Sequence, residues 1–162
     1  EEVEIDGLIS HCLSQIESQA GGKNIQLDVQ KNAPSGTMIS DERSVRQILL
    51  NLLSNAVKFT QSGGKISLSI DETDDEVVFR VADNGIGIPA DRLPTIAEPF
   101  SHSAIHPHVA KEGTGLGLSI VRSLSVLLDG GFTIDSEVGI GTTVTIRLPK
   151  NADRASAEAQ TA

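Results

Sequence analysis

The sequence predicts an α+β fold, a two-layer α/β sandwich in which a mixed, mostly antiparallel sheet carries about three helices on one face. Two pairs of alternating strands, at residues 65–71 with 76–82 and at 132–138 with 142–148, are each joined by a short turn and therefore read as hairpins. Three other segments place apolar residues at helical spacing. Because hairpins give antiparallel neighbours, the helices are expected to cover one face of this sheet.

The elements before the first hairpin are predicted from spacing and from cap and turn residues. Apolar residues at helical spacing indicate a helix over residues 5–19, which Gly21 and Gly22 end. The next predicted elements are an alternating strand at 25–29, a turn at 34–36, a short strand at 37–39, and a long helix that Ser40 or Asp41 caps and that runs to about Phe59.

The elements after the first hairpin are separated by glycine-rich segments. They are a glycine loop at 83–87, a short helix from Pro89 to near Phe100, an aperiodic loop at 101–112, a helix from Gly113 to about Leu128 ended by Gly130-Gly131, and the second hairpin.

One domain accounts for most of the chain. Residues 1–149 hold all the predicted elements, and residues 150–162, rich in alanine and charge, are predicted to be a disordered tail. The first residue is not Met, so we expect a fragment of a longer protein. The single cysteine, Cys12, excludes an internal disulfide and fits a reducing compartment.

Composition excludes two classes of function. The formal net charge is −9, so no basic surface is expected for nucleic acid. No apolar run approaches the roughly 18–20 residues of a membrane span. Because the overall field repels polyanions, any phosphate binding must come from local groups such as amide N–H groups, a helix N-terminus, one or two lysines and a metal ion.

The long helix carries a polar stripe on an otherwise apolar surface. Gln47, Asn51, Asn55 and Lys58 fall within a narrow stripe at about 100° per residue. A helix this apolar is buried on most sides, so the stripe faces either solvent or a ligand cavity. An asparagine carbonyl oxygen can bind Mg²⁺, and a lysine supplies a point charge for phosphate.

Two glycine motifs suit the approach of a ligand to the backbone. Asp83 to Gly87 is a common turn signal, but in a pocket Asp83 can accept from an exocyclic amine such as adenine N6. Gly113 to Leu118 alternates three glycines with other residues at the start of a helix. Helix N-termini point unpaired N–H groups at phosphate, so this second motif predicts a phosphate site.

In this order, the motifs resemble the catalytic ATP-binding domain of sensor histidine kinases. Residues 51–60 resemble its N box, 83–87 its G1 box, 98–100 its F box, 113–118 its G2 box and 139–142 its G3 motif. The resemblance spans about residues 1–149 and implies the Bergerat fold shared with the gyrase, Hsp90 and MutL (GHKL) ATPases. The sequence of residues 93–100 further resembles the PleC and DivJ group of cell-cycle kinases.

The resemblance implies ATP and Mg²⁺ as cofactors. It assigns Mg²⁺ to Asn55, with Asn51 and Lys58 beside it as the other catalytic residues, and adenine N6 to Asp83 with support from Thr142. The full set of residues expected to bind the nucleotide is Asn51, Asn55, Lys58, Phe59, Asp83, Gly85, Ile86, Gly87, Lys111, Gly113, Thr114, Gly115, Leu116, Gly117, Leu118 and Thr142.

The residue at position 51 favours a kinase over a hydrolase. GHKL ATPases carry a glutamate one helical turn before the Mg²⁺-binding asparagine, as general base for water; here that residue is Asn51, which cannot accept a proton at neutral pH. In histidine kinases the nucleophile is instead a histidine on a separate dimerisation domain. No such acceptor motif is visible, and His11 lies among core residues, so the chain is expected to bind ATP without phosphorylating itself.

The loop at residues 101–112 is expected to close over the phosphates, with Lys111 as a contact to the γ-phosphate. Its His102, His106 and His108 offer Zn²⁺ binding as a less favoured alternative. The expected partners are the dimerisation and phosphotransfer domain of the same kinase and a response regulator receiver domain. The domain is expected to be a cytoplasmic monomer and the parent kinase a homodimer, attached to a membrane or not. The alternative function is a pseudokinase or binding module.

Overall fold

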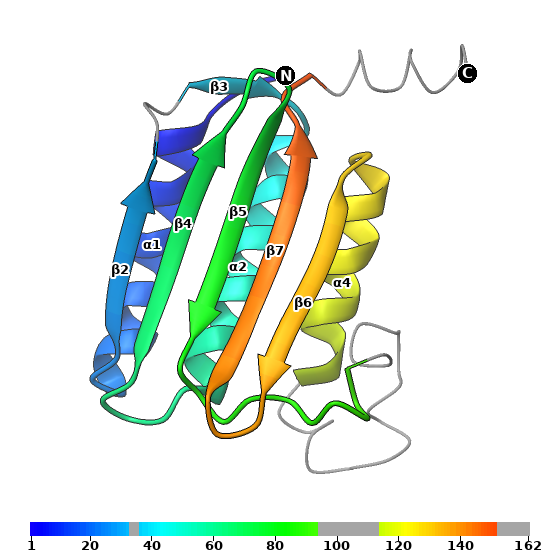
Figure 1. The fold of residues 1–162 in the computed structure, drawn as a ribbon. Coiled ribbons are helices and arrows are strands. Elements are labelled where there is room, and N and C mark those ends of the chain that lie inside the picture. Colours follow the sequence, from blue (N-terminus) through cyan, green and yellow to red (C-terminus); the bar gives the residue numbers. More distant parts are fainter. Residues whose placement is uncertain (33–35, 94–113, 152–162) are drawn as a thin grey trace.

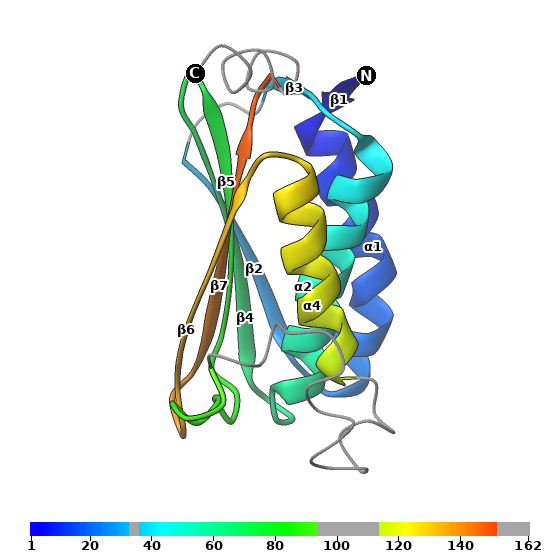
Figure 2. The ribbon, with the colours of Figure 1, turned by 90° about the vertical axis from the view of Figure 1, so that its right-hand side faces the viewer.

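The computed structural model describes residues 1–32, 36–93 and 114–151, which form two layers (Figures 1 and 2). The helices are α1 (Ile5–Gly22), α2 (Glu42–Phe59) and α4 (Thr114–Leu127). The strands are β1 (Glu2–Glu4), β2 (Gln26–Lys31), β3 (Thr37–Ile39), β4 (Lys65–Glu72), β5 (Glu76–Asp83), β6 (Gly131–Glu137) and β7 (Gly141–Pro149). No helix in these described ranges is long and apolar enough to cross a membrane.

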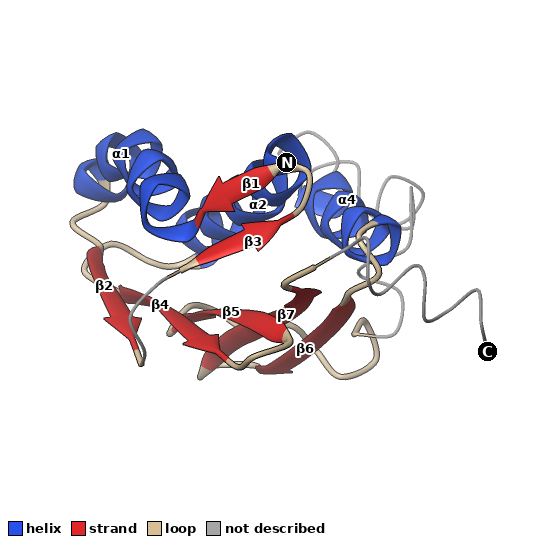
Figure 3. Ribbon diagram, turned by 90° about the horizontal axis from the view of Figure 1, so that it is seen from above, coloured by secondary structure: helices blue, strands red, loops and turns tan. Residues whose placement is uncertain are grey.

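Five strands form the main sheet, in the order β2-β4-β5-β7-β6. Strands β2 and β4 are parallel, and the other neighbours are antiparallel. The parallel pair arises because the chain crosses over through α2 between β2 and β4, whereas both predicted hairpins give antiparallel pairs. Figure 3 shows all three helices on one face of this sheet, so the predicted mixed α+β sandwich is confirmed.

The core lies between the two layers. Along β4 the side chains alternate, and Ile66, Leu68 and Ile70 point inward with no more than 2% of each exposed. Phe79 on β5 and Leu53 on α2 are fully buried. Burying side chains of this size contributes about 1.5–3 kcal/mol each, which fixes α2 against the centre of the sheet and holds its C-terminal end near the ends of β5 and β7.

The structure departs from the local predictions in three places. Helix α1 extends past the predicted residue 19 and ends at Gly22, within the glycine pair that was predicted to end it. Residues 90–93 after Pro89 form a turn rather than the start of a helix, and residues 94–100 lie outside the described range. Strand β1 was not predicted, because its three residues carry no pattern of their own and are ordered by pairing with β3.

The end of the domain remains a prediction. Strand β7 ends at Pro149, and Lys150 and Asn151 still contact the fold through β3, the latter as a parallel bridge to Ile39. Residues 152–162, the rest of the predicted tail, lie outside the described residues.

Candidate functional site

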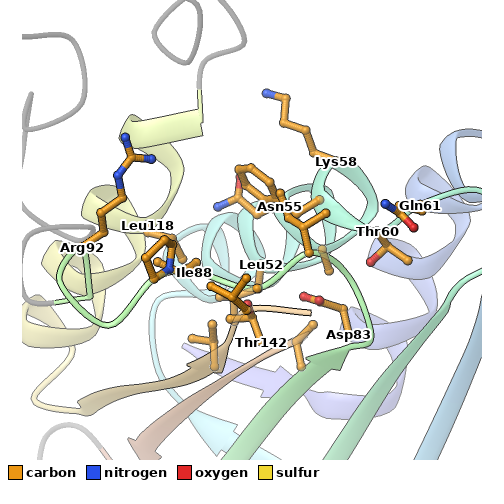
Figure 4. A pocket seen from close by; sticks show the side chains of 18 of the residues that line it. Leu52, Asn55, Lys58, Thr60, Gln61, Asp83, Ile88, Arg92, Leu118 and Thr142 are labelled. Atoms are coloured by element: carbon orange, nitrogen blue, oxygen red, sulfur yellow. The ribbon is translucent and has the colours of Figure 1, made fainter. Parts of the chain in front are cut away.

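A pocket of about 610 Å³ opens at the C-terminal end of α2. It is bounded by α2, by the end of β5 with the loop after it, by the start of β7 and by α4 (Figure 4). Its lining residues are Lys23, Leu52, Asn55, Ala56, Lys58, Phe59, Thr60, Gln61, Val81, Asp83, Ile86, Gly87, Ile88, Pro89, Arg92, Leu118, Val138, Thr142 and Val144.

Helix α2 supplies one wall. Leu52, Asn55 and Lys58 recur at the three-residue spacing that places side chains on one helix face, and all three line the pocket. Asn55 is half-buried, and its Nδ2 atom is buried without a hydrogen-bond partner. Leaving a buried amide donor unpaired costs about 1–3 kcal/mol. The position of Asn55 is therefore more favourable when a bound ligand pairs with its amide than in the free domain.

In the structure, only two of the four residues of the predicted polar stripe line the pocket. Asn55 and Lys58 line the pocket, whereas Asn51 and Gln47 are not among its lining residues. Gln47 is exposed and donates a 3.2 Å hydrogen bond to Oδ1 of Asn51. The Nδ2 atom of Asn51 is buried and has no partner, as in Asn55 one turn further along.

Helix α4 supplies the opposite wall. It begins at Thr114, so residues 114–117 are its first four, and in any α-helix the first four N–H groups have no acceptor within the helix. Gly117 packs directly on Asn55: a Cβ at this position would lie 2.8 Å from Nδ2 of Asn55. Leu118 is buried and lines the pocket. The predicted residues Gly113 and Lys111 lie outside the described residues.

The loop after β5 carries the predicted glycine motif into the pocket. The N–H of Gly85 donates to Oδ1 of Asp83 at 2.9 Å, and the N–H of Ile86 donates to the carbonyl of Phe59 at 3.2 Å. Gly87 has φ +76°, and a Cβ there would lie 2.1 Å from the carbonyl oxygen of Glu137. Only glycine fits this left-handed position against another backbone.

Asp83, the last residue of β5, is the acidic group of the pocket floor. Burial raises the pKa of its carboxyl, and the backbone N–H groups of Gly85 and Thr142 act in the opposite direction. Figure 4 shows Asp83 and Thr142 together, across the pocket from Asn55 and Lys58. The carboxylate therefore presents an acceptor on the floor of the pocket, across from Lys58.

Thr142 is held by a serine that the sequence interpretation missed. Asp83, Thr142 and Ser136 are successive cross-strand partners on β5, β7 and β6. The hydroxyl of Ser136 lies 2.7 Å from that of Thr142, accepts from the N–H of Ile88 at 2.7 Å and donates to the carbonyl of Gly141 at 3.0 Å. A lone serine in a strand has no sequence signal of this role.

Lys23 is a second residue that was missed. From the C-terminus of α1, its ammonium donates to the carbonyls of Val57, Lys58 and Thr60 at 2.8, 3.2 and 2.9 Å. These carbonyls lie at the C-terminal end of α2, where the helix supplies no N–H donors for them. Lys23 therefore fixes the end of α2, next to the Phe59 carbonyl that Ile86 contacts.

Arg92 also lines the pocket and lies outside every predicted motif. Figure 4 places it beside Leu118, at the opposite end of the pocket from Asp83. Together with Lys58 it gives the pocket a cationic side and an acidic floor, a charge separation that suits a ligand with an amine at one end and an anion at the other.

Comparison with known proteins shows which protein family has this sequence and fold. Residues 40–152 match the model of the histidine kinase-, DNA gyrase B-, and HSP90-like ATPase family. The histidine protein kinase DivJ of Caulobacter vibrioides is 42% identical over 110 residues, which cover 68% of this chain and 18% of that protein. This relative supports the predicted likeness to DivJ.

Two solved structures have the same fold. The catalytic domain of the histidine kinase ThkA superposes with a TM-score of 0.82 at 24% identity, covering 95% of this chain and 97% of that one. Full-length ShkA, solved in complex with AMPPNP, has a TM-score of 0.79 at 35% identity, covering 92% of this chain and 30% of that one. The chain thus spans less than a third of the length of both DivJ and ShkA.

Proposed function

Because this chain belongs to the histidine kinase-, DNA gyrase B-, and HSP90-like ATPase family, we propose that it is the catalytic ATP-binding domain of a two-component sensor histidine kinase. In this role it donates the γ-phosphoryl group of ATP to a histidine on a separate dimerisation domain. The observation that carries the proposal is the pocket itself, which brings Asn55, Lys58, Asp83 and Thr142 from three distant segments to one cavity.

Adenine is assigned to the acidic floor of the pocket. The carboxylate of Asp83 accepts from the exocyclic amine, and the hydroxyl of Thr142 supports that contact. Ile86 and Gly87 line the same region, where the absence of a side chain at Gly87 lets a flat ring pass close to the backbone. Phe59 lines the pocket at the end of α2 and packs along the nucleotide.

The phosphates are assigned to the opposite side. Lys58 and Arg92 supply positive charge, and the first N–H groups of α4 supply donors. The donor set fits Mg²⁺, because the neutral amide oxygen of Asn55 is a hard ligand and its buried amide has no protein partner to hold it elsewhere. When bound, Mg²⁺ neutralises charge on the phosphates. Asn51, one turn earlier, is not among the lining residues of the pocket.

Phosphoryl transfer, rather than hydrolysis, follows from the side chains around the phosphates. An amide at position 51 takes no proton from water, so within the described residues the α2 wall holds no carboxylate to activate a water nucleophile. The domain then keeps ATP intact and presents its γ-phosphoryl in line to the incoming imidazole. Lys111 and Gly113 are proposed to complete the phosphate contacts.

The proposed partners are the dimerisation and histidine-phosphotransfer domain of the same kinase and a response regulator receiver domain. The isolated domain is proposed to be a cytoplasmic monomer within a homodimeric parent. The dimerisation domain would meet the catalytic domain near the pocket mouth, because its histidine must come within bonding range of the γ-phosphoryl group. The receiver domain would take the phosphoryl group from that histidine and not from ATP.

Calorimetry with AMPPNP, with and without Mg²⁺, tests the proposal. We expect Mg²⁺-dependent binding by the wild-type chain, and loss of most of that binding in Asn55→Ala. An absence of binding at millimolar nucleotide would refute the proposal and favour the pseudokinase or binding module. Incubation with γ-labelled ATP should leave the isolated chain unlabelled; label on the chain would contradict an acceptor histidine on a separate domain.

A further inference from the structure

The hydroxyl of Ser136 has three hydrogen-bond partners, and two of them can act in one direction only. The carbonyl of Gly141, 3.0 Å away, can only accept, so it takes the single proton of Ser136. The N–H of Ile88, 2.7 Å away, can only donate, so it occupies one lone pair of Ser136. The remaining contact of Ser136 is with the hydroxyl of Thr142 at 2.7 Å.

The consequence falls on Thr142. With the proton of Ser136 given to Gly141, we assign the hydroxyl of Thr142 as the donor in their 2.7 Å contact, a distance that by itself allows either direction. The proton of Thr142 then points along the sheet toward Ser136, and only its lone pairs are left for the pocket that Thr142 lines. Asp83, its cross-strand neighbour on β5, likewise offers only acceptors when ionised.

We propose that Ser136 is a positioning residue that makes the pocket floor specific for a 6-amino purine over a 6-oxo purine. With Ser136 present, Asp83 and Thr142 form a pair of acceptors, which an exocyclic amine satisfies directly or through one water. A 6-oxo group brings another acceptor to that position and finds no proton there, so it leaves polar atoms unpaired. The inference rests on the proposed function, since it takes a purine triphosphate as the ligand.

Removal of the Ser136 hydroxyl should relax this selection. In Ser136→Ala the proton of Thr142 loses its acceptor and becomes free to turn toward the pocket, where it can donate to a 6-oxo group. Isothermal titration with ATP and with inosine triphosphate, which differ at position 6 and in the proton on N1, measures the ratio of the two dissociation constants. We expect Ser136→Ala to shift this ratio toward inosine triphosphate by roughly tenfold, the value of one recovered hydrogen bond of about 1.4 kcal/mol.

A second substitution separates positioning from packing. If the relaxed ratio comes from the freed proton of Thr142, then Ser136→Ala combined with Thr142→Val should return to the strong preference for ATP over inosine triphosphate. A packing role for Ser136 would not depend on that hydroxyl. Ser125→Ala is the control, because Ser125, like Ser136, donates to a carbonyl, that of Val121 on α4, but is fully buried and does not line the pocket.

The outcomes separate the two proposals. If the wild-type chain binds ATP and Ser136→Ala keeps the wild-type ratio, the role of Ser136 is refuted while the proposed function stands. If the wild-type chain binds neither nucleotide, both are refuted. Should Ser136→Ala not fold, Ser136→Cys keeps the side-chain volume with a weak hydrogen-bonding group and should shift the ratio in the same direction; an unchanged ratio there would equally refute the proposal.

Discussion

Replacement of Gly117 by alanine should weaken nucleotide binding by about 10–100-fold without unfolding the domain. Gly117 lies in the first turns of α4, and its Cα faces the amide of Asn55. A Cβ added there would lie 2.8 Å from Nδ2, 3.1 Å from Oδ1 and 3.3 Å from Cγ of Asn55. These contacts are with the end of a side chain and not with backbone, so the asparagine moves and the helix stays.

The two effects of the substitution on stability are of similar size. Alanine in place of glycine in a helix gains up to about 1 kcal/mol. Pushing Asn55 away from its preferred rotamer costs about 0.5–1.5 kcal/mol. The free energy of unfolding should therefore change by less than about 1 kcal/mol. Nucleotide affinity should fall by about 10–100-fold, the usual cost of disturbing the group that orients a metal ligand.

Thermal unfolding without nucleotide and calorimetry with AMPPNP and Mg²⁺ measure the two quantities separately. Gly21→Ala is the matched control, since Gly21 also lies in a helix but has nothing within 4 Å of the added Cβ. It should keep wild-type affinity. Wild-type affinity in Gly117→Ala would show that contact with Gly117 does not set the position of Asn55, and the reasoning about this wall would fail.

Three further predictions concern the charged and metal-binding groups. Lys58→Ala should weaken ATP binding about tenfold and leave AMP binding unchanged, because the exposed ammonium of Lys58 contacts only the outer phosphates. Lys65→Ala is the control: it loses a surface ion pair with Asp28 and should change neither dissociation constant. Asp83→Asn should raise the melting temperature of the free domain at pH 7 by roughly 2–4 °C. Burial raises the pKa of Asp83, so the wild type loses stability as pH rises from 3.8 through the folded value; the advantage of the variant in thermal scans should therefore vanish below pH 3.8. Chelation of Mg²⁺ should weaken ATP binding at least about tenfold in the wild type but have little effect in Asn55→Ala, as calorimetry with and without chelator would show.

Much of the fold could be predicted because its signals are local. The two hairpins and the three long helices follow from alternation, helical spacing and glycine-rich turns, and the structure confirms each of them. The parallel pairing of β2 with β4 could not be predicted, because the sequence of neither strand specifies which strand lies beside it in the sheet. The role of Lys23 at the end of α2 could not be predicted, because its acceptors lie 34 to 37 residues away along the chain.

The candidate site divides in the same way. Asn55, Asp83 and Thr142 stand in motifs and were predicted, and the structure places all of them on the pocket. Lys23 acts on backbone carbonyls and Ser136 acts on the side chain of Thr142. Both contacts join residues that belong to no shared sequence motif, so the two roles become visible only in the structure. Arg92 follows a glycine loop at no fixed spacing, which leaves the sequence without a reason to choose it.

The free domain carries unfavourable features where the ligand is expected to act. Of the four buried side-chain atoms without a partner among the described residues, those of Asn55 and Thr60 belong to the pocket lining, and that of Asn51 lies one helical turn from it. On the opposite side, burial raises the pKa of the Asp83 carboxyl, which makes its ionised form costly. The costs at Asp83, Asn55 and Thr60 should fall when a nucleotide in the pocket supplies an amine to Asp83 and polar partners to the other two. Such costs persist in a fold when they serve a ligand, so the same atoms that lower the stability of the free domain should make nucleotide binding stabilise it strongly.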